Sequence, residues 1–197
     1  MLKTLPLFKI TIANDEEGID KMSLVSAPAV ESDFLKFSKQ EQIRLSVDDE
    51  QHIVLGVALR CDYPIYRISP SGQEYYVMFD ADTIRKIYEK FMKNPNKVNL
   101  EHSVDTEGVY LIQSFIKNSE AGINPVGFED IENGSWFTAY KVDNTDVWNK
   151  IKSGELNGFS IEGLFTLIDT DIDIEQEFNS DHCDKDEMES LIDELLS

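Results

Sequence analysis

Short segments with strand character follow one another along most of this sequence, and only two stretches inside it have helical periodicity. Alternating apolar residues, or dense β-branched and aromatic residues, mark the strand-like segments. They lie at 8–15, 21–30, 43–47, 52–68, 73–79, 97–103, 108–116, 134–142 and 155–165. Such close spacing favours an antiparallel, barrel-like sheet over alternating strand and helix units. We therefore expect a mainly β fold with inserted helices.

Local signals punctuate these segments. Pro64 marks an edge or a bend within 52–68, and the turn at 69–72 predicts that 73–79 returns beside that strand. The segments 97–103 and 108–116 are expected to pair across an acidic turn. Asp80 or Asp82 can cap a helix over 80–94, and Gly154 can end a second helix over 144–154. The apolar face of the first helix consists of Ile84, Ile87, Tyr88 and Phe91.

Negative charge is concentrated at the C-terminal end. The chain of 197 residues has a net charge of −20, and the segment 169–197 holds twelve acidic residues against one lysine. We expect a folded domain over 1–168 and an acidic tail over 169–197 that ends in a short amphipathic helix. A charge of this sign disfavours nucleic acids and anionic membranes as partners.

The rest of the composition points to an intracellular protein. The apolar run at 53–59 is far shorter than a membrane span, and the N-terminus has no cleavage site of the signal-peptide type. Two widely separated cysteines, Cys61 and Cys183, are expected to be free thiols in the cytosol.

Signatures of cofactor and metal sites are missing from the sequence, so we expect neither. It contains no P-loop, dinucleotide fingerprint, H-E-x-x-H or C-x-x-C pattern. The aspartates from Asp169 onwards resemble an EF-hand loop at first sight. Such a loop needs a glycine at its sixth position and a glutamate at its twelfth, where this chain has Ile174 and Ser180.

One hydroxyl interrupts the apolar segment 155–165. Ser160 is either a small filler or a side chain displayed for chemistry, and its flanking "GFSIEG" lacks the G-x-S-x-G spacing of the hydrolases. A catalytic serine needs a base, and histidine has a suitable pKa. His52 opens a strand and His182 lies in the acidic tail. His102, which follows an apolar strand, is the candidate base, with a structural histidine as the alternative.

The order of the segments resembles a family of phage serine proteases of the XkdF-like type, relatives of the prohead proteases that mature capsids. The matching pieces are "MSLVSAPAVESDFLKFS", "VLGVALRCDYPIYR", "EYYVMFDADTIRKIYEKFM", "VNLEHS", "GVYLIQSFI" and "GSWFTAYKVDNTDVWNKIKSGELNGFSIEGLF". Together they cover about residues 8–168. The resemblance implies a closed, assemblin-like antiparallel barrel with a Ser–His pair and an orienting third residue. It gives the nucleophile role to Ser160 and the base role to His102.

The third residue is harder to assign. In ordinary prohead proteases the acid follows the serine in the chain, whereas the matching piece here precedes both catalytic candidates. The resemblance therefore implies a circular permutation, with the acid-bearing strand moved to the N-terminus. The aligned residue, Lys21, cannot serve as an acid. Asp20 is one step away and is the preferred candidate, and Glu17 is the next.

Two other carboxylates stay open if the permutation does not hold. Glu162 and Asp169 lie close to Ser160 in the sequence. Glu162 shares a side of a regular strand with Ser160, which favours it over Asp169.

The resemblance also implies a function, a place and partners. It implies an endopeptidase that cleaves scaffold and capsid proteins, and itself, inside the immature phage head in the host cytoplasm. The implied partners are the scaffolding protein, the major capsid protein, the portal and further copies of the chain. The alternative is a capsid assembly or scaffold component that keeps the protease fold without needing activity.

Overall fold

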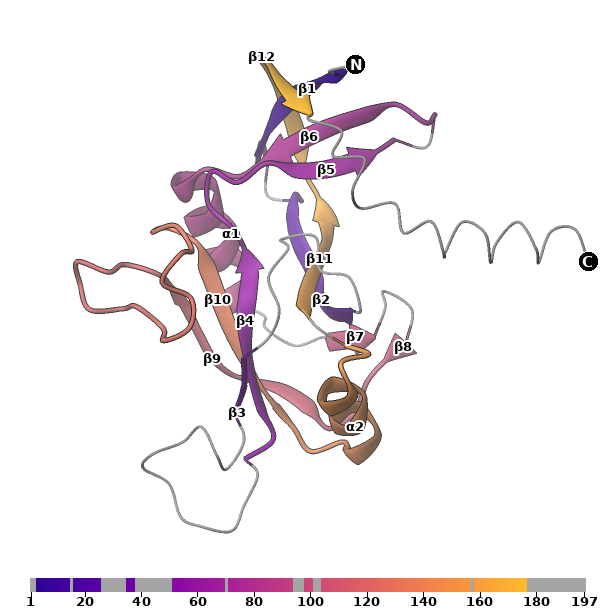
Figure 1. Ribbon diagram of the computed structural model, residues 1–197, viewed down its shortest axis with the longest axis vertical. Coiled ribbons are helices and arrows are strands. Elements are labelled where there is room, and N and C mark those ends of the chain that lie inside the picture. The colour runs from indigo at the N-terminus through magenta and orange to yellow at the C-terminus, as the bar shows by residue number, and fades with distance from the viewer. Residues whose placement is uncertain are drawn as a thin grey trace, which may run out of the picture.

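The described part of the protein is mainly β with two inserted helices, as the sequence predicts (Figure 1). The computed structural model describes residues 3–14, 16–25, 35–37, 51–69, 71–93, 98–100, 104–156 and 158–176. The helices are α1 (Ala81–Lys93) and α2 (Thr145–Ser153). The strands are β1 (Lys3–Thr11), β2 (Gly18–Val25), β3 (Leu35–Phe37), β4 (Ile53–Leu59), β5 (Ile65–Ile68), β6 (Glu74–Met78), β7 (Val98–Leu100), β8 (Val104–Asp105), β9 (Val109–Ile116), β10 (Trp136–Val142), β11 (Gly158–Leu164) and β12 (Thr166–Gln176).

These strands form three four-stranded sheets. Their orders are β12-β1-β6-β5, β3-β4-β10-β9 and β11-β2-β7-β8. Most neighbours are antiparallel, but β1 with β6 and β2 with β7 run parallel. The expectation of a purely antiparallel sheet is wrong at these two places, because long connections give the chain room to return in the same direction.

A long antiparallel ribbon connects two of the sheets. Only Phe165 separates β11 from β12, and these strands pair in turn with β2 and β1. Figure 1 shows the orange and yellow strands beside the indigo ones. The last pair on one side of the junction is Thr11 with Thr166, and the first on the other is Gly18 with Leu164. The N-terminal strands therefore hold the C-terminal ones in both sheets.

The main core lies against β10, whose residues are nearly all buried. On one face, the Trp136 ring meets Phe91 of α1 edge-on, with ring centroids 5.1 Å apart. On the other face, Phe137 stacks on Phe115 of β9 at 5.5 Å. Helix α1 also packs against β2, and β11 packs against β4. The core thus positions β2 and β11, which carry the candidate site residues Asp20, Ser160 and Glu162.

Most local predictions are confirmed. The Asp80 carboxylate accepts a hydrogen bond from the backbone N–H of Thr83 at 2.8 Å and so caps α1. Gly154 ends α2 with φ at 82°, the left-handed conformation of a helix C-cap. Strands β4 and β5 are separate elements around Pro64, and β6 pairs antiparallel with β5.

One predicted strand pair is wrong. The segments 97–103 and 108–116 do not pair with each other among the described residues: β7 pairs with β2 and β8, and β9 pairs with β10. Strand β10, with seven residues, offers the eight-residue β9 a partner of similar length, whereas β7 has only three residues.

Two other expectations concern a short strand at 43–47 and the acidic segment that begins at Asp169. The segment 43–47 lies outside the described residues. The acidic segment from Asp169 is part of β12 as far as Gln176, with Asp169, Asp171 and Asp173 exposed. Neither α1 nor α2 has the length and apolar character that a membrane span requires.

Candidate functional site

Ser160 lies on β11, the outer strand of the sheet β11-β2-β7-β8. Its position is directly opposite Ser23 of β2, and Ser23 in turn lies beside Asn99 of β7. These three backbone positions form one row across the sheet. Strand β7 ends at Leu100, two positions before residue 102 in the sequence.

The strand that carries Ser160 is anchored in the core by its neighbour. Phe159 is fully buried, and its ring lies 5.3 Å from the ring of Tyr140 on β10. On the facing strand, Met22, Ser23 and Leu24 are also fully buried. The apolar residues around the serine therefore serve packing. They fix the backbone position of Ser160 through tightly held neighbours.

Asp20 lies on β2 where the pairing with β11 is irregular. The register passes from the pair Lys21 and Glu162 to the pair Ile19 and Gly163, so Asp20 is the extra residue of a β-bulge. Bulges redirect side chains and occur often beside active sites. Because β2 pairs with β11, the backbones of Asp20 and Ser160 belong to adjacent strands.

A close approach of two backbones fixes this bulge. A Cβ atom on Gly163 would lie 1.9 Å from the carbonyl oxygen of Gly18, far inside van der Waals contact. Any side chain at residue 163 would push β11 away from β2. Gly163 is thus a structural residue of the site that the sequence did not single out, although the glycine in "GFSIEGLF" interrupts an otherwise regular strand.

The proposed base lies outside the described residues. His102 comes two positions after the end of β7. The structure therefore places the backbones of Ser160 and Asp20 in one sheet, and the assignment of His102 stays a prediction.

Glu17 has a structural role at the junction of the ribbon. Its carboxylate accepts hydrogen bonds from the backbone N–H of Ala13 at 2.8 Å, from Thr166 Oγ1 at 2.9 Å and from Asn14 Nδ2 at 3.0 Å. These bonds, that from Ala13 foremost, lower the pKa of Glu17. The Lys90 ammonium also donates to the backbone oxygen of Glu17. This carboxylate thus ties the loop after β1 to the start of β12.

The other two candidate acids, Glu162 and Asp169, differ in their position relative to β11, the strand of Ser160. Glu162 lies on β11 itself, opposite Lys21. Asp169 lies on β12 in a different sheet, and its Oδ1 accepts a hydrogen bond from the backbone N–H of Asp171 at 2.9 Å. Glu162 is the better placed of the two for a role near Ser160.

Two buried hydroxyls near this site lack hydrogen bonds within the described part of the chain. They belong to Thr138 and Tyr140, both fully buried on β10. Burial raises the pKa of Tyr140 far above the usual range, so its hydroxyl stays protonated. Its ring contacts Phe159, next to the candidate nucleophile. The alternation in 134–142 indicated a strand but not that these hydroxyls would be unpaired.

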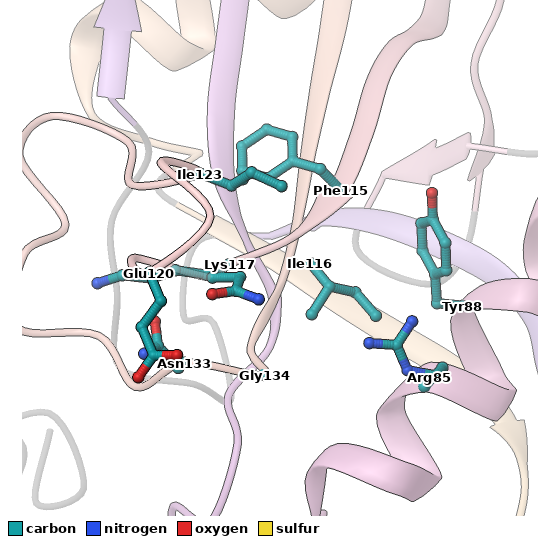
Figure 2. A pocket seen from close by; sticks show the side chains of 10 residues that line it. Arg85, Tyr88, Phe115, Ile116, Lys117, Glu120, Ile123, Asn133 and Gly134 are labelled. Carbon is teal, nitrogen blue, oxygen red and sulfur yellow. The ribbon is translucent and has the colours of Figure 1, made fainter.

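A cavity of about 530 Å³ lies between α1 and the loop after β9 (Figure 2). Arg85 and Tyr88 of α1 line it on one side, and Ile116, Glu120 and Asn133 line it from β9 and the loop.

The lysine beside this cavity holds the loop in place. Lys117 is 2% exposed, and its ammonium donates to the backbone oxygens of Ile131 at 2.5 Å, Phe128 at 2.7 Å and Glu129 at 3.2 Å. Three acceptors satisfy its three protons. Lys117 therefore stabilises the loop 118–134 and has no proton to spare for a ligand.

Nucleophile and metal alternatives find little support in the described residues. The Cys61 thiol is buried, and burial, together with a hydrogen bond to Asp62, raises its pKa to about 12. Such a thiol carries almost no thiolate at neutral pH. Within the described ranges, no group of three or more His, Cys, Asp or Glu side chains is placed to hold a metal ion.

Comparison with known proteins identifies the family. A family model described as "Putative phage serine protease XkdF" matches residues 40–169. "Uncharacterized protein YqbD" of Bacillus subtilis (strain 168) is 26% identical over 133 residues, which are 68% of this chain and 38% of that protein. "Phage-like element PBSX protein XkdF" of the same strain is 25% identical over 136 residues, 69% of this chain and 43% of that protein.

This chain therefore spans less than half the length of either relative. No solved structure matches. The family match covers more than half of the chain and includes His102 and Ser160, whereas Asp20 precedes it. The chain belongs to the family described as "Putative phage serine protease XkdF".

Proposed function

We propose that this protein is a serine endopeptidase of phage capsid maturation, with Ser160 as nucleophile, His102 as general base and Asp20 as the orienting acid. The observation that carries the proposal is the family match, because its segment holds both Ser160 and His102. The sheet supports it, since β2 pairs on one side with the serine strand and on the other with β7, which precedes residue 102.

The reaction is acyl transfer to the serine. His102 takes the proton from Ser160 Oγ, which attacks a peptide carbonyl, and the resulting imidazolium returns the proton to the leaving amine. Water then hydrolyses the acyl-enzyme by the same proton relay. Asp20 holds the imidazole in the correct tautomer, and backbone N–H groups stabilise the oxyanion.

A closed, assemblin-like barrel with permuted strand order is part of this proposal. The pairing of β2 supports the permutation, because this strand from the N-terminal segment occupies a central position between β11 and β7. The backbone supports the choice of acid, since Asp20 lies on the strand that pairs with the strand of Ser160. Glu17 is less suitable because its carboxylate already accepts three hydrogen bonds.

Membership of the family supports a proposal for the substrates and the place of action. We propose that the enzyme acts inside the immature head in the host cytoplasm, on scaffolding protein, major capsid protein and itself, in contact with the portal and with further copies of the chain. The name of one relative, a phage-like element protein, supports a role in a phage particle. The acidic segment 169–197 would recruit the enzyme or be removed by it.

Replacement of the nucleophile tests the activity. Ser160→Ala should abolish processing of the co-expressed capsid protein and of the chain itself, followed by intact mass, and should prevent labelling by a fluorophosphonate. Ser153→Ala is the matched control, because its hydroxyl only bonds the backbone oxygen of Lys150 at the end of α2. Processing by this control should equal that of the unmodified chain.

The second candidate function is that of an assembly or scaffold component with the same fold. Unchanged processing by Ser160→Ala would refute the protease proposal and favour this second function.

A substitution of the proposed acid tests its role. Asp20→Asn should slow turnover strongly while labelling of Ser160 weakens but persists, because the nucleophile and base remain.

A further inference from the structure

Strand β12 forms an outer edge of the fold. Nine of its eleven residues pair with β1 on one side, Thr170 and Asp171 form a bulge between them, and no described strand pairs with the other side. Figure 1 shows β12 at one end of the molecule, beside β1. An edge strand presents a row of backbone N–H and C=O groups that can pair with another chain.

One face of this edge is aliphatic. Ile172 and Ile174 lie directly opposite Leu7 and Leu5 of β1, and directly paired residues share a face of the sheet. Leu5 and Leu7 are buried, whereas Ile172 is 52% exposed. Ile168 shares this face, where it lies opposite Lys9, and is 49% exposed. The aliphatic surface of the sheet therefore continues to its edge without cover from the described residues.

The opposite face of the edge is acidic. Asp169 and Asp173 lie opposite Phe8 and Pro6 of β1, which alternate with the leucines on that strand. Both aspartates are exposed. The whole segment 166–176 contains no lysine or arginine. A chain that pairs with this edge thus meets isoleucines on one face and, on the other, carboxylates together with the exposed Leu167, which lies opposite Ile10.

The charge decides which chain can pair here. A second copy of β12 would bring aspartates beside aspartates, and like charges on neighbouring strands destabilise a sheet. A strand with aliphatic residues on one face and lysine or arginine on the other would instead extend the apolar face and neutralise the acidic one.

We propose that β12 is a docking strand for an extended segment of a partner protein in which aliphatic and basic residues alternate, bound by addition to the sheet edge. The docking strand uses neither Ser160 nor its sheet. The proposal therefore holds or fails independently of the protease activity.

Peptide binding to the purified full chain tests this. The probe is a fluorescein-labelled peptide of about nine residues with alternating lysine and valine, the length of a strand, followed by fluorescence anisotropy. A peptide of the same composition, with pairs of lysines alternating with pairs of valines, should bind about tenfold more weakly, because it cannot match both faces. N-methylation of the central peptide bonds should weaken binding to a similar extent.

Matched variants of the protein locate the contact. Asp169→Asn with Asp173→Asn removes two charges and leaves at residue 169 an oxygen that can accept the hydrogen bond from Asp171. We expect about tenfold weaker binding of the alternating peptide. The control, Glu120→Gln with Asp130→Asn, removes two exposed charges from the loop 118–134 and should change the affinity less than twofold.

Several results would overturn the proposal. Equal loss of affinity in both double variants would mean attraction by net charge alone. Equal affinity for the two lysine–valine peptides, or no effect of N-methylation, would exclude pairing with a strand edge. Absence of saturable binding would exclude this class of partner. The unmodified chain could also self-associate. If the Asp169→Asn, Asp173→Asn variant self-associated more strongly than the unmodified chain, a second copy of the chain would be the occupant of this edge.

Discussion

The two ends of the long ribbon differ in how they are covered. Where β11 meets β2, Phe159 and Leu24 are fully buried, because α1, β4 and β10 pack around these strands. Where β12 meets β1, Ile168 and Ile172 are about half exposed. The same two chain segments thus build a rigid support for Ser160 at one end and an open edge at the other. Burial, rather than strand pairing, distinguishes the end suited to catalysis from the end suited to docking.

The largest expected effect tests this difference directly. Phe159→Ala should lower the free energy of unfolding by about 4 kcal/mol, because it leaves a cavity beside Tyr140 in the closed core. Ile172→Ala at the open end should cost about 1 kcal/mol or less, since half of that side chain is already in water. Urea unfolding of both variants measures the contrast. Similar losses would show that the two ends are equally well packed.

The junction between the two ends gives the next effect. Gly163→Ala should lower the free energy of unfolding by about 3 kcal/mol, because the new Cβ would overlap the carbonyl oxygen of Gly18. Urea unfolding measures the loss. Gly72→Ala is the control: its φ is 82°, but no atom lies within 4 Å of the added Cβ. It should cost about 1 kcal/mol, the strain of a left-handed alanine. Equal losses would mean that β11 can move away from β2 without penalty.

Local elements were predicted well because their causes are local. The cap Asp80, the apolar face of α1 and the left-handed Gly154 are each a signal that involves only residues close together in the sequence. Strand pairing depends on contacts between distant segments, which no spacing in the sequence encodes. This is why the pairing of 97–103 with 108–116 was wrong, and why the two parallel pairs were not expected.

The candidate site was predictable only in part, for the same reason. Ser160 could be located as a hydroxyl in an apolar strand, but its place opposite Ser23 depends on β2, which lies more than one hundred residues earlier. The bulge at Asp20 results from the contact between Gly18 and Gly163, which is a property of two strands together. Among the candidate acids, only the structure revealed that the Glu17 carboxylate is already engaged.

The end of the ribbon where β11 meets β2 also contains a destabilising feature, and its removal should change the free energy of unfolding by less than the substitutions above. The Tyr140 hydroxyl is buried without a hydrogen-bond partner in the described part of the chain. Tyr140→Phe keeps the ring contact with Phe159 and should raise the free energy of unfolding by about 1 kcal/mol, the order of the penalty for an unpaired buried group. Thermal unfolding followed by circular dichroism measures the gain. A loss of stability would reveal that a buried water or another group satisfies this hydroxyl.

The smallest effect concerns the ion pair that links the two ends. Asp80 at the start of α1 pairs with Lys9 of β1. Burial raises the pKa of Asp80, but the hydrogen bonds from Lys9 and Thr83 outweigh it and hold the pKa at about 2. Because this value lies below that of the unfolded chain, near 3.8, the charged carboxylate stabilises the fold above about pH 4 and loses this effect as the pH falls towards 2.

Asp80→Asn keeps an oxygen that can cap α1 and removes only the charge. Solvent screens this partly exposed pair, so we expect a loss of about 1 kcal/mol or less at pH 7. The difference from the unmodified chain should shrink steadily from about pH 5 downwards, as the unfolded and then the folded carboxyl becomes protonated. Urea unfolding at a series of pH values measures it. A loss of stability that stays constant down to about pH 2 would assign the effect to the helix cap. The ion pair between Lys9 of β1 and Asp80 of α1 would then contribute nothing measurable to stability.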